Sequence, residues 1–164
     1  MRFCSIASGS SGNCIYVGSD NTHVLVDIGI SGKKMETGLN SLELTGRDLD
    51  GILITHEHSD HIKGLGVISR KYGIPIYATA GTVDAMVRTN ALGKIPEGIF
   101  HEIQEDEPFM INDLKVNPFT IPHDAAQPVG YRLEHEGHSV GIATDLGKYN
   151  DYIIENLQGL DALL

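Results

Sequence analysis

Short apolar runs separated by glycine and polar turns dominate the chain. Runs of this kind, bounded by turn-forming residues, are typical of strands. The pattern predicts strands over Phe3–Ala7, Cys14–Val17, His23–Asp27, Gly51–Thr55, Ile76–Ala78, Leu114–Ile121, Val129–Glu134 and Ser139–Thr144.

Helical signals lie between these runs and predict helices over Ser31–Leu42, Asp60–Tyr72, Thr82–Leu92 and Tyr149–Leu157. Thr82 is expected to cap the third of these helices, and Gly93 and Pro96 are expected to end it. Strands dominate the start of the chain and return as hairpins after Phe100. We therefore expect a sheet covered by helices, in an α/β or α+β arrangement rather than a strictly alternating parallel one.

The chain closes on a further apolar run, Leu160–Leu164, which predicts the start of another buried strand. A native domain rarely stops just inside such a run. We therefore expect residues 1–164 to form a single domain that is incomplete at its C-terminus. A short edge strand at a true C-terminus is the alternative interpretation.

Composition narrows the class of protein. The chain has 164 residues, 41% of them hydrophobic and 21% charged, which argues against wholesale disorder. No apolar run approaches the ~18–20 residues that cross a bilayer, and two cysteines make no disulfide framework. We expect a cytoplasmic protein without a membrane partner. With 12 basic and 22 acidic residues the net charge is −10, so nucleic-acid binding would require a local basic face.

The strongest chemical signal is the segment Thr55–His61, with the sequence THEHSDH, directly after a predicted strand. His56 and His58 alternate, so their imidazoles can converge on one ion, while Asp60 and His61 can turn toward a second. Imidazole with carboxylate is a ligand set for zinc, and for iron or manganese where carboxylates carry more weight. A polar helix cap would need Asp60 alone and does not explain three histidines.

Two further candidate ligands each follow a predicted strand downstream. His123 comes after the strand Leu114–Ile121, and Asp145 comes after the strand Ser139–Thr144. Taken alone, either residue is more often a turn residue than a ligand. Their order relative to the histidine cluster gives them weight.

This order of residues resembles the metallo-β-lactamase superfamily of binuclear hydrolases, whose pattern also includes an upstream strand ending in an aspartate, here Asp27. The segments Ser8–Cys14 and Thr55–His61 are similar to the YycJ (WalJ-like) branch, whose members are regarded as metal-dependent, DNA-directed exonucleases of bacteria. The resemblance covers the whole chain. It implies an αββα sandwich of two similar halves, with the first half and part of the second present here.

The resemblance also implies two divalent ions, zinc first, with manganese or iron as alternatives. The imidazoles of His56, His58 and His123 would hold the first ion. Asp60 and His61 would hold the second ion, and the Asp145 carboxylate would bridge the two. Asp27 would order the ligand loop, and Asp60 would also shuttle a proton. The family's remaining histidine ligand of the second ion has no counterpart before Leu164.

Such a ligand set predicts hydrolysis. Two divalent ions about 3.5–4 Å apart lower the pKa of a bridging water, so that hydroxide exists at neutral pH and attacks phosphorus or a carbonyl carbon. The preferred function is a phosphodiesterase or exonuclease acting on DNA or another phosphodiester. One alternative is a hydrolase of small esters, thioesters or lactams, which would need a narrow apolar pocket. Another is an inactive half-domain that pairs with a second copy as a homodimer.

Other segments leave two interpretations open. Ser8–Asn13 either presents backbone N–H groups to a phosphate or forms a tight turn between strands. Lys33 and Lys34 either begin a solvated helix or contact a nucleic-acid backbone. The remaining histidines fit no ligand spacing and are expected at surface or hairpin positions: His23, His101, His135 and His138.

Overall fold

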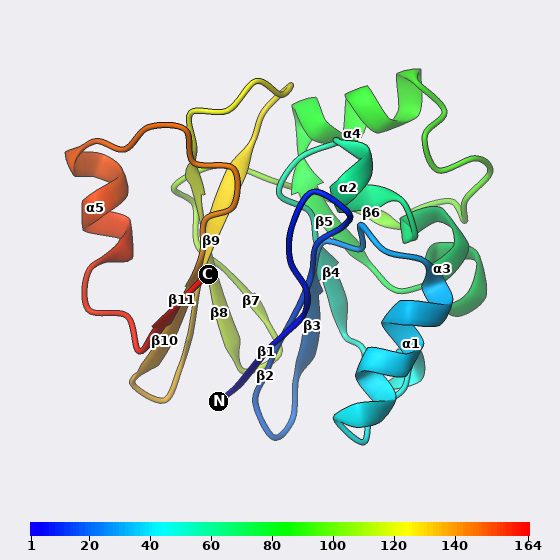
Figure 1. Ribbon diagram of the computed structural model, residues 1–164, viewed down its shortest axis with the longest axis horizontal. Helices are drawn as coiled ribbons and strands as arrows, with labels where there is room; N and C mark the ends of the chain where they lie inside the picture. Colours follow the sequence, from blue (N-terminus) through cyan, green and yellow to red (C-terminus); the bar gives the residue numbers. More distant parts are fainter.

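The computed structural model describes residues 1–164, which form two β-sheets packed face to face (Figure 1). The first sheet has six strands in the order β1-β2-β3-β4-β5-β6. β1 to β3 pair antiparallel, and β3 to β6 pair parallel. The strands are β1 (Arg2–Ala7), β2 (Cys14–Gly18), β3 (His23–Val26), β4 (Gly51–Leu53), β5 (Ile76–Thr79) and β6 (Phe100–Ile103).

The second sheet has five strands in the order β11-β10-β9-β8-β7. β7 to β10 pair antiparallel, and β11 adds to β10 in parallel. The strands are β7 (Phe109–Ile111), β8 (Leu114–Thr120), β9 (Val129–His135), β10 (His138–Ile142) and β11 (Ala162–Leu163).

Helices lie on the outer faces of both sheets (Figure 1). α1 to α4 lie on the side of the first sheet, and α5 lies on the side of the second. The helices are α1 (Gly32–Ser41), α2 (Ser59–Ile62), α3 (Leu65–Tyr72), α4 (Ala80–Arg88) and α5 (Asp151–Leu157), with a 3-10 turn at Gly46–Asp48. This helix–sheet–sheet–helix layering confirms the predicted α/β class. None of the helices is long and apolar enough to cross a bilayer.

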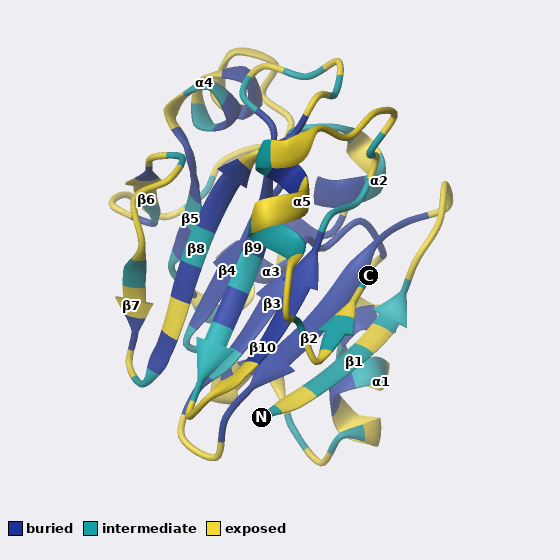
Figure 2. Cartoon of the chain, turned by 90° about the vertical axis from the view of Figure 1, so that its left-hand side faces the viewer, coloured by how far each residue is buried: buried dark blue, intermediate teal, exposed yellow.

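The central strands β2, β3 and β4 of the first sheet are buried on both faces, which explains their continuous apolar runs. In β2, Tyr16 packs among the residues beneath the helices, whereas Val17 faces the second sheet. Leu25 and Val26 divide in the same way in β3. In Figure 2 the strands β2, β3 and β4 are coloured as buried, whereas β1 at the edge of the sheet is partly exposed.

All eight predicted strands form, with ends that differ by up to two residues. β6 and β7 were not predicted as individual strands, because their short segments mix apolar residues with exposed polar ones. The run Leu160–Leu164 does form a strand, β11, but it is not buried, since Leu163 is 55% exposed. The prediction of a buried strand at this position was therefore wrong: β11 lies at the edge of its sheet.

The helix predicted over Asp60–Tyr72 is in fact two helices, α2 and α3, interrupted between Ile62 and Leu65. The Gly64 amide donates to the Ile28 carbonyl at 2.8 Å instead of continuing the helix ladder. A Cβ on Gly64 would lie 2.1 Å from the Ile30 carbonyl oxygen. The break therefore exists because the chain after β3 packs directly against the backbone of this turn.

The helix predicted over Thr82–Leu92 starts and ends earlier, as α4. Its N-cap is Thr79 rather than Thr82. Thr82 lies inside the helix and shares hydrogen bonds with Thr79 Oγ1 and the Gln127 carbonyl. At the other end Asn90 has a φ of 51°, a left-handed conformation that stops the helix before Leu92.

Candidate metal centre

The candidate ligands meet at one edge of the sandwich. β3 and β4 are parallel, so the chain leaves both strands at the same edge, β3 toward Asp27 and β4 toward the segment Thr55–His61. β8 and β10 both run antiparallel to β9, so they too share a direction. His123 and Asp145 follow the ends of β8 and β10. The carboxyl ends of strands are the common location of ligand sites in α/β sheets.

His56, His58 and His123 form one group of converging imidazoles. One ring nitrogen from each lies within 4.8 Å of the others, and His123 Nε2 lies 3.3 Å from His58 Nδ1. The ring planes cross at 69–80°, so the rings meet edge to face instead of stacking. The space between His58 Nδ1 and His123 Nε2 admits at most one proton. A metal cation in its place would be bound by the lone pairs of both nitrogens.

A second group shares His56 and adds His61 and Asp145, again with one atom each within 4.8 Å. His61 Nε2 lies 3.0 Å from Asp145 Oδ2. Asp60 lies beside this group rather than in it, with Oδ2 at 3.6 Å from His61 Nε2 and a side chain 31% exposed. That Asp60 is a ligand remains a prediction, and its position at the rim is compatible with one.

Asp27 determines which ring nitrogens face the centre. Its carboxylate is fully buried and accepts hydrogen bonds from Thr55 N and Thr55 Oγ1, both at 2.8 Å. His61 Nδ1 lies 2.7 Å from Asp27 Oδ2, so the proton sits on Nδ1 and Nε2 keeps its lone pair. Because Thr55 Oγ1 gives its proton to Asp27, it accepts one from His56 Nδ1 at 3.0 Å. His56 Nε2 is thereby left as a lone-pair donor too.

The protonation of the two buried histidines differs. Burial, followed by the neighbouring imidazoles, lowers the pKa of His56 to about 2, so this ring is neutral. Burial also acts to lower the pKa of His61, but the hydrogen bond and charge of Asp27, with the charges of Asp60 and Asp145, outweigh it and leave the pKa raised. The pKa values of the two buried imidazoles therefore move in opposite directions, down in His56 and up in His61.

A divalent cation fits these residues. His56 Nε2 is buried and has no hydrogen-bond partner, and an orphaned buried nitrogen is costly unless something binds it. The donor atoms around it are imidazole nitrogens and a carboxylate oxygen, the set that zinc and related metals prefer.

Comparison with known proteins identifies the family. A sequence model described as the Beta-lactamase superfamily domain matches residues 22–164. The chain belongs to the β-lactamase superfamily. Exodeoxyribonuclease YycJ of Bacillus anthracis is 40% identical to it over 164 residues, which are 100% of this chain and 61% of that protein. The resemblance inferred from the sequence is confirmed.

Solved structures of the superfamily share the fold. The metallo-β-lactamase fold protein YhfI from Bacillus subtilis superposes with a TM-score of 0.77 at 18% identity, covering 98% of this chain and 68% of YhfI. Zn²⁺-bound PqqB from Methylobacterium extorquens gives a TM-score of 0.75 at 18% identity, covering 92% of this chain and 58% of PqqB. The chain spans about 60% of the length of the curated relatives that match 97–100% of it.

In this superfamily member, the loop that carries His123 is held by residues that sequence reasoning missed. The Gln127 carbonyl accepts a hydrogen bond from Thr79 Oγ1 at 2.8 Å, and Gln127 Oε1 accepts one from the Gly81 amide at 2.8 Å. Glu57 Oε1 accepts one from the Ala126 amide at 2.9 Å. The position of Glu57 within the histidine segment was a sequence signal for its role. No sequence signal pointed to Gln127, because its hydrogen-bond partners are distant in sequence.

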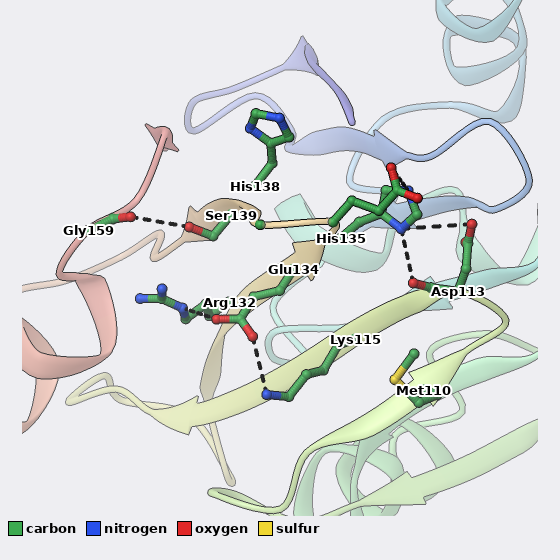
Figure 3. Close-up of a pocket in the computed structure, with 11 residues that line it drawn as sticks. Met110, Asp113, Lys115, Arg132, Glu134, His135, His138, Ser139 and Gly159 are labelled. Atoms are coloured by element: carbon green, nitrogen blue, oxygen red, sulfur yellow. Dashed lines mark hydrogen bonds and ion pairs between the residues drawn. The ribbon is translucent and has the colours of Figure 1, made fainter.

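The histidines outside the cluster occupy the predicted surface and hairpin positions. His135 ends β9 and His138 begins β10, on either side of a two-residue turn. They line a pocket of about 490 Å³ (Figure 3). Its cations are already paired, since Lys115 and Arg132 both contact the Glu134 carboxylate, at 3.2 and 2.6 Å. The charges of Lys115 and Arg132 are thus neutralised within the pocket, which we interpret as a structural feature of the hairpin.

Glycine is required at position 29, because the backbone there packs directly against Asp60 and Asn13. A Cβ at this position would lie 1.6 Å from the Asp60 carbonyl oxygen and 2.7 Å from the Asn13 amide nitrogen. Gly29→Ala is expected to force α2 away from the loop at Asn13 and to lower the free energy of unfolding by at least about 2 kcal/mol. Urea denaturation followed by circular dichroism measures this loss.

Gly147→Ala is the matched control, because a Cβ on Gly147 would meet nothing within 4 Å. This variant is expected to unfold within about 0.5 kcal/mol of the parent. Equal stability of Gly29→Ala and Gly147→Ala would contradict the close approach of Gly29 to Asp60.

Proposed function

We propose that this chain is a metal-dependent phosphodiesterase that holds two divalent ions and cleaves DNA from an end. The observation that carries the proposal is the convergence of three imidazoles and one aspartate on His56, whose buried Nε2 has no partner in the protein. The printed name of the Bacillus anthracis relative, an exodeoxyribonuclease, supports DNA as the substrate class. Zinc is the proposed metal, with manganese or iron as alternatives.

The proposed ligands follow the two groups of side chains. His56, His58 and His123 would hold the first ion, Asp60 and His61 would hold the second, and Asp145 would bridge them. Asp27 would fix the tautomers of His56 and His61 from behind, through its contacts with Thr55 Oγ1 and His61 Nδ1. When bound, the ions supply Lewis acidity and lower the pKa of water to the neutral range.

The chain's own residues supply orientation and proton transfer. His56 is neutral and buried, so it presents a lone pair without first losing a proton. The Asp60 carboxylate is half-buried at the rim, beside His61. We assign Asp60 Oδ2 to take the proton of the attacking water and to return it to the leaving oxygen of the phosphodiester.

Hydrolysis and metal content test the proposal together. The 164-residue chain, loaded with Zn²⁺ or Mn²⁺ and dialysed, is expected to hold about two ions per chain. It should then hydrolyse bis(4-nitrophenyl) phosphate, release nucleotides from end-labelled DNA, and lose both activities in EDTA. A chain that binds two ions but hydrolyses only a thioester or a lactam would overturn the assignment to phosphodiesters.

A further inference from the structure

Beside the metal centre lies a groove that the ligand set does not use. It has a volume of about 770 Å³ and runs between the loop after β1 and the first turns of α1. Ser8, Ser11 and Gly12 line one wall, and Lys33, Lys34 and Thr37 line the other. Its size lies within the range of about 300–1,000 Å³ that is usual for ligand pockets.

The charge of the groove is opposite to that of the protein. Lys33 and Lys34 are exposed and make no ion pair, and no aspartate or glutamate lines the groove. The whole chain nevertheless has a net charge of −10. The pocket of Figure 3 offers the contrast, because there Lys115 and Arg132 are both neutralised by Glu134. Two unpaired cations in a hollow attract anions in a way that paired ones do not.

The groove wall is continuous with the metal centre. Gly12 lines the groove, and the next residue, Asn13, donates its amide to the Asp60 carbonyl at 2.8 Å. The Asn13 side chain also reaches His61, with Nδ2 at 3.3 Å from Nε2. A single residue, Asn13, therefore joins the lining of the groove to the metal centre.

The groove is also lined by apolar residues and by hydroxyls. The apolar residues are Ile6, Ala7 and Ile30, and the hydroxyls belong to Ser8, Ser11, Ser31 and Thr37. Lysine ammonium groups bind phosphate oxygens as point charges, hydroxyls hydrogen-bond to phosphate and sugar, and apolar side chains accommodate sugar or base. This combination matches a nucleotide chain better than it matches a small neutral ester.

We propose that this groove binds the phosphodiester backbone of a single DNA strand as it leaves the metal centre, with Lys33 and Lys34 contacting successive phosphates. This inference rests on the proposed phosphodiesterase function, to which it adds the path of the substrate. Of the two interpretations of Lys33 and Lys34, it adopts nucleic-acid contact.

Binding without cleavage tests the inference. Fluorescence anisotropy of a labelled oligodeoxythymidine, titrated with the 164-residue chain in EDTA across a series of salt concentrations, gives affinity and salt dependence. Lys33→Gln/Lys34→Gln is expected to weaken binding roughly tenfold or more at low salt and to reduce the slope of log K against log salt by about 1.4, or 0.7 for each phosphate contact. Lys33→Arg/Lys34→Arg, which keeps the charge, should retain the affinity.

The matched control removes two charges elsewhere. Arg47 and Lys94 are exposed, form no ion pair and lie outside the groove, so Arg47→Gln/Lys94→Gln is expected to bind like the parent. Equal weakening by this control would reduce the effect to net charge and would overturn the groove. Competition by thymidine monophosphate as effective as that by the oligonucleotide would overturn a strand path in favour of a small-ligand pocket.

The two proposals fail separately. If the parent hydrolyses bis(4-nitrophenyl) phosphate but its DNA affinity does not depend on Lys33 and Lys34, the groove assignment is wrong and the phosphodiesterase stands. If DNA binding depends on the two lysines while no phosphodiester is hydrolysed with metal bound, the groove stands and the proposed chemistry is wrong.

Discussion

His58→Ala is expected to abolish tight metal binding at the three-histidine group while leaving the secondary structure intact. His58 makes no side-chain cap to α2 and is only half-buried, so its truncation leaves no closed cavity. It does remove Nδ1, which lies 3.3 Å from His123 Nε2 within this group. Loss of an outer residue that merely orients a ligand costs roughly 10–100-fold in metal affinity, and loss of a ligand should cost more.

Isothermal titration with Zn²⁺ and elemental analysis after dialysis measure this effect, with circular dichroism as the check on folding. His138→Ala is the control, because His138 is 63% exposed and belongs to neither group. It should bind metal like the parent. Near-parental metal content in His58→Ala would show that His58 is not a ligand.

Asp27→Asn is expected to weaken metal binding without touching a ligand. Asparagine has the same shape and tolerates the left-handed backbone at this position, where φ is 61°. The amide oxygen keeps the place of Oδ1 and still accepts from Thr55 N, so the NH2 group takes the place of Oδ2. That NH2 donates toward His61 Nδ1, so His61 is driven to the tautomer that carries the proton on Nε2. That proton would point toward Asp145 Oδ2 and occupy the lone pair a metal needs. We expect metal affinity to fall roughly 10–100-fold.

The same substitution is expected to cost stability. Asp27 accepts three hydrogen bonds in a site with no exposed surface, from Thr55 N, Thr55 Oγ1 and His61 Nδ1. A buried donor left without its acceptor costs about 1–3 kcal/mol, so the free energy of unfolding should fall by a similar amount. Urea denaturation measures this change, and ¹⁵N chemical shifts of the histidine rings report the tautomer of His61.

Asp50→Asn separates tautomer control from the general loss of a carboxylate. Asp50 accepts the His23 amide at 2.8 Å and lies outside both histidine groups. Its replacement should leave metal affinity and the His61 tautomer unchanged. An unchanged tautomer and affinity in Asp27→Asn as well would refute the role of Asp27.

Much of the fold follows from local pattern. In the central strands of the first sheet, a run such as Cys14–Val17 buries alternate side chains in two different cores, so every residue in it is apolar. The break between α2 and α3 could not be predicted, because it depends on the contact of Gly64 with the carbonyls of Ile28 and Ile30, more than thirty residues upstream. Local helical spacing carries no information about such a neighbour.

The candidate site likewise has features that were visible in the sequence and features that depend on tertiary packing. The spacing of His56, His58 and His61 after a strand was visible in the sequence, because ligands on a strand-to-helix turn are adjacent along the chain. The contributions of Thr55 and Gln127 were not visible, since each acts through partners brought close only by packing: Thr55 by bonding to Asp27, and Gln127 by anchoring to Thr79.

The sequence by itself determined most of the strands and the family, and it named the candidate metal ligands, because apolar periodicity and residue spacing are local properties of the chain. Only the tertiary structure decided which nitrogen of each histidine faces the centre and that Asp60 lies at its rim. It alone joined the Ser8–Asn13 loop to α1 as one basic groove. These features depend on distances between segments that are far apart in sequence, and such distances exist only once the two sheets have packed together.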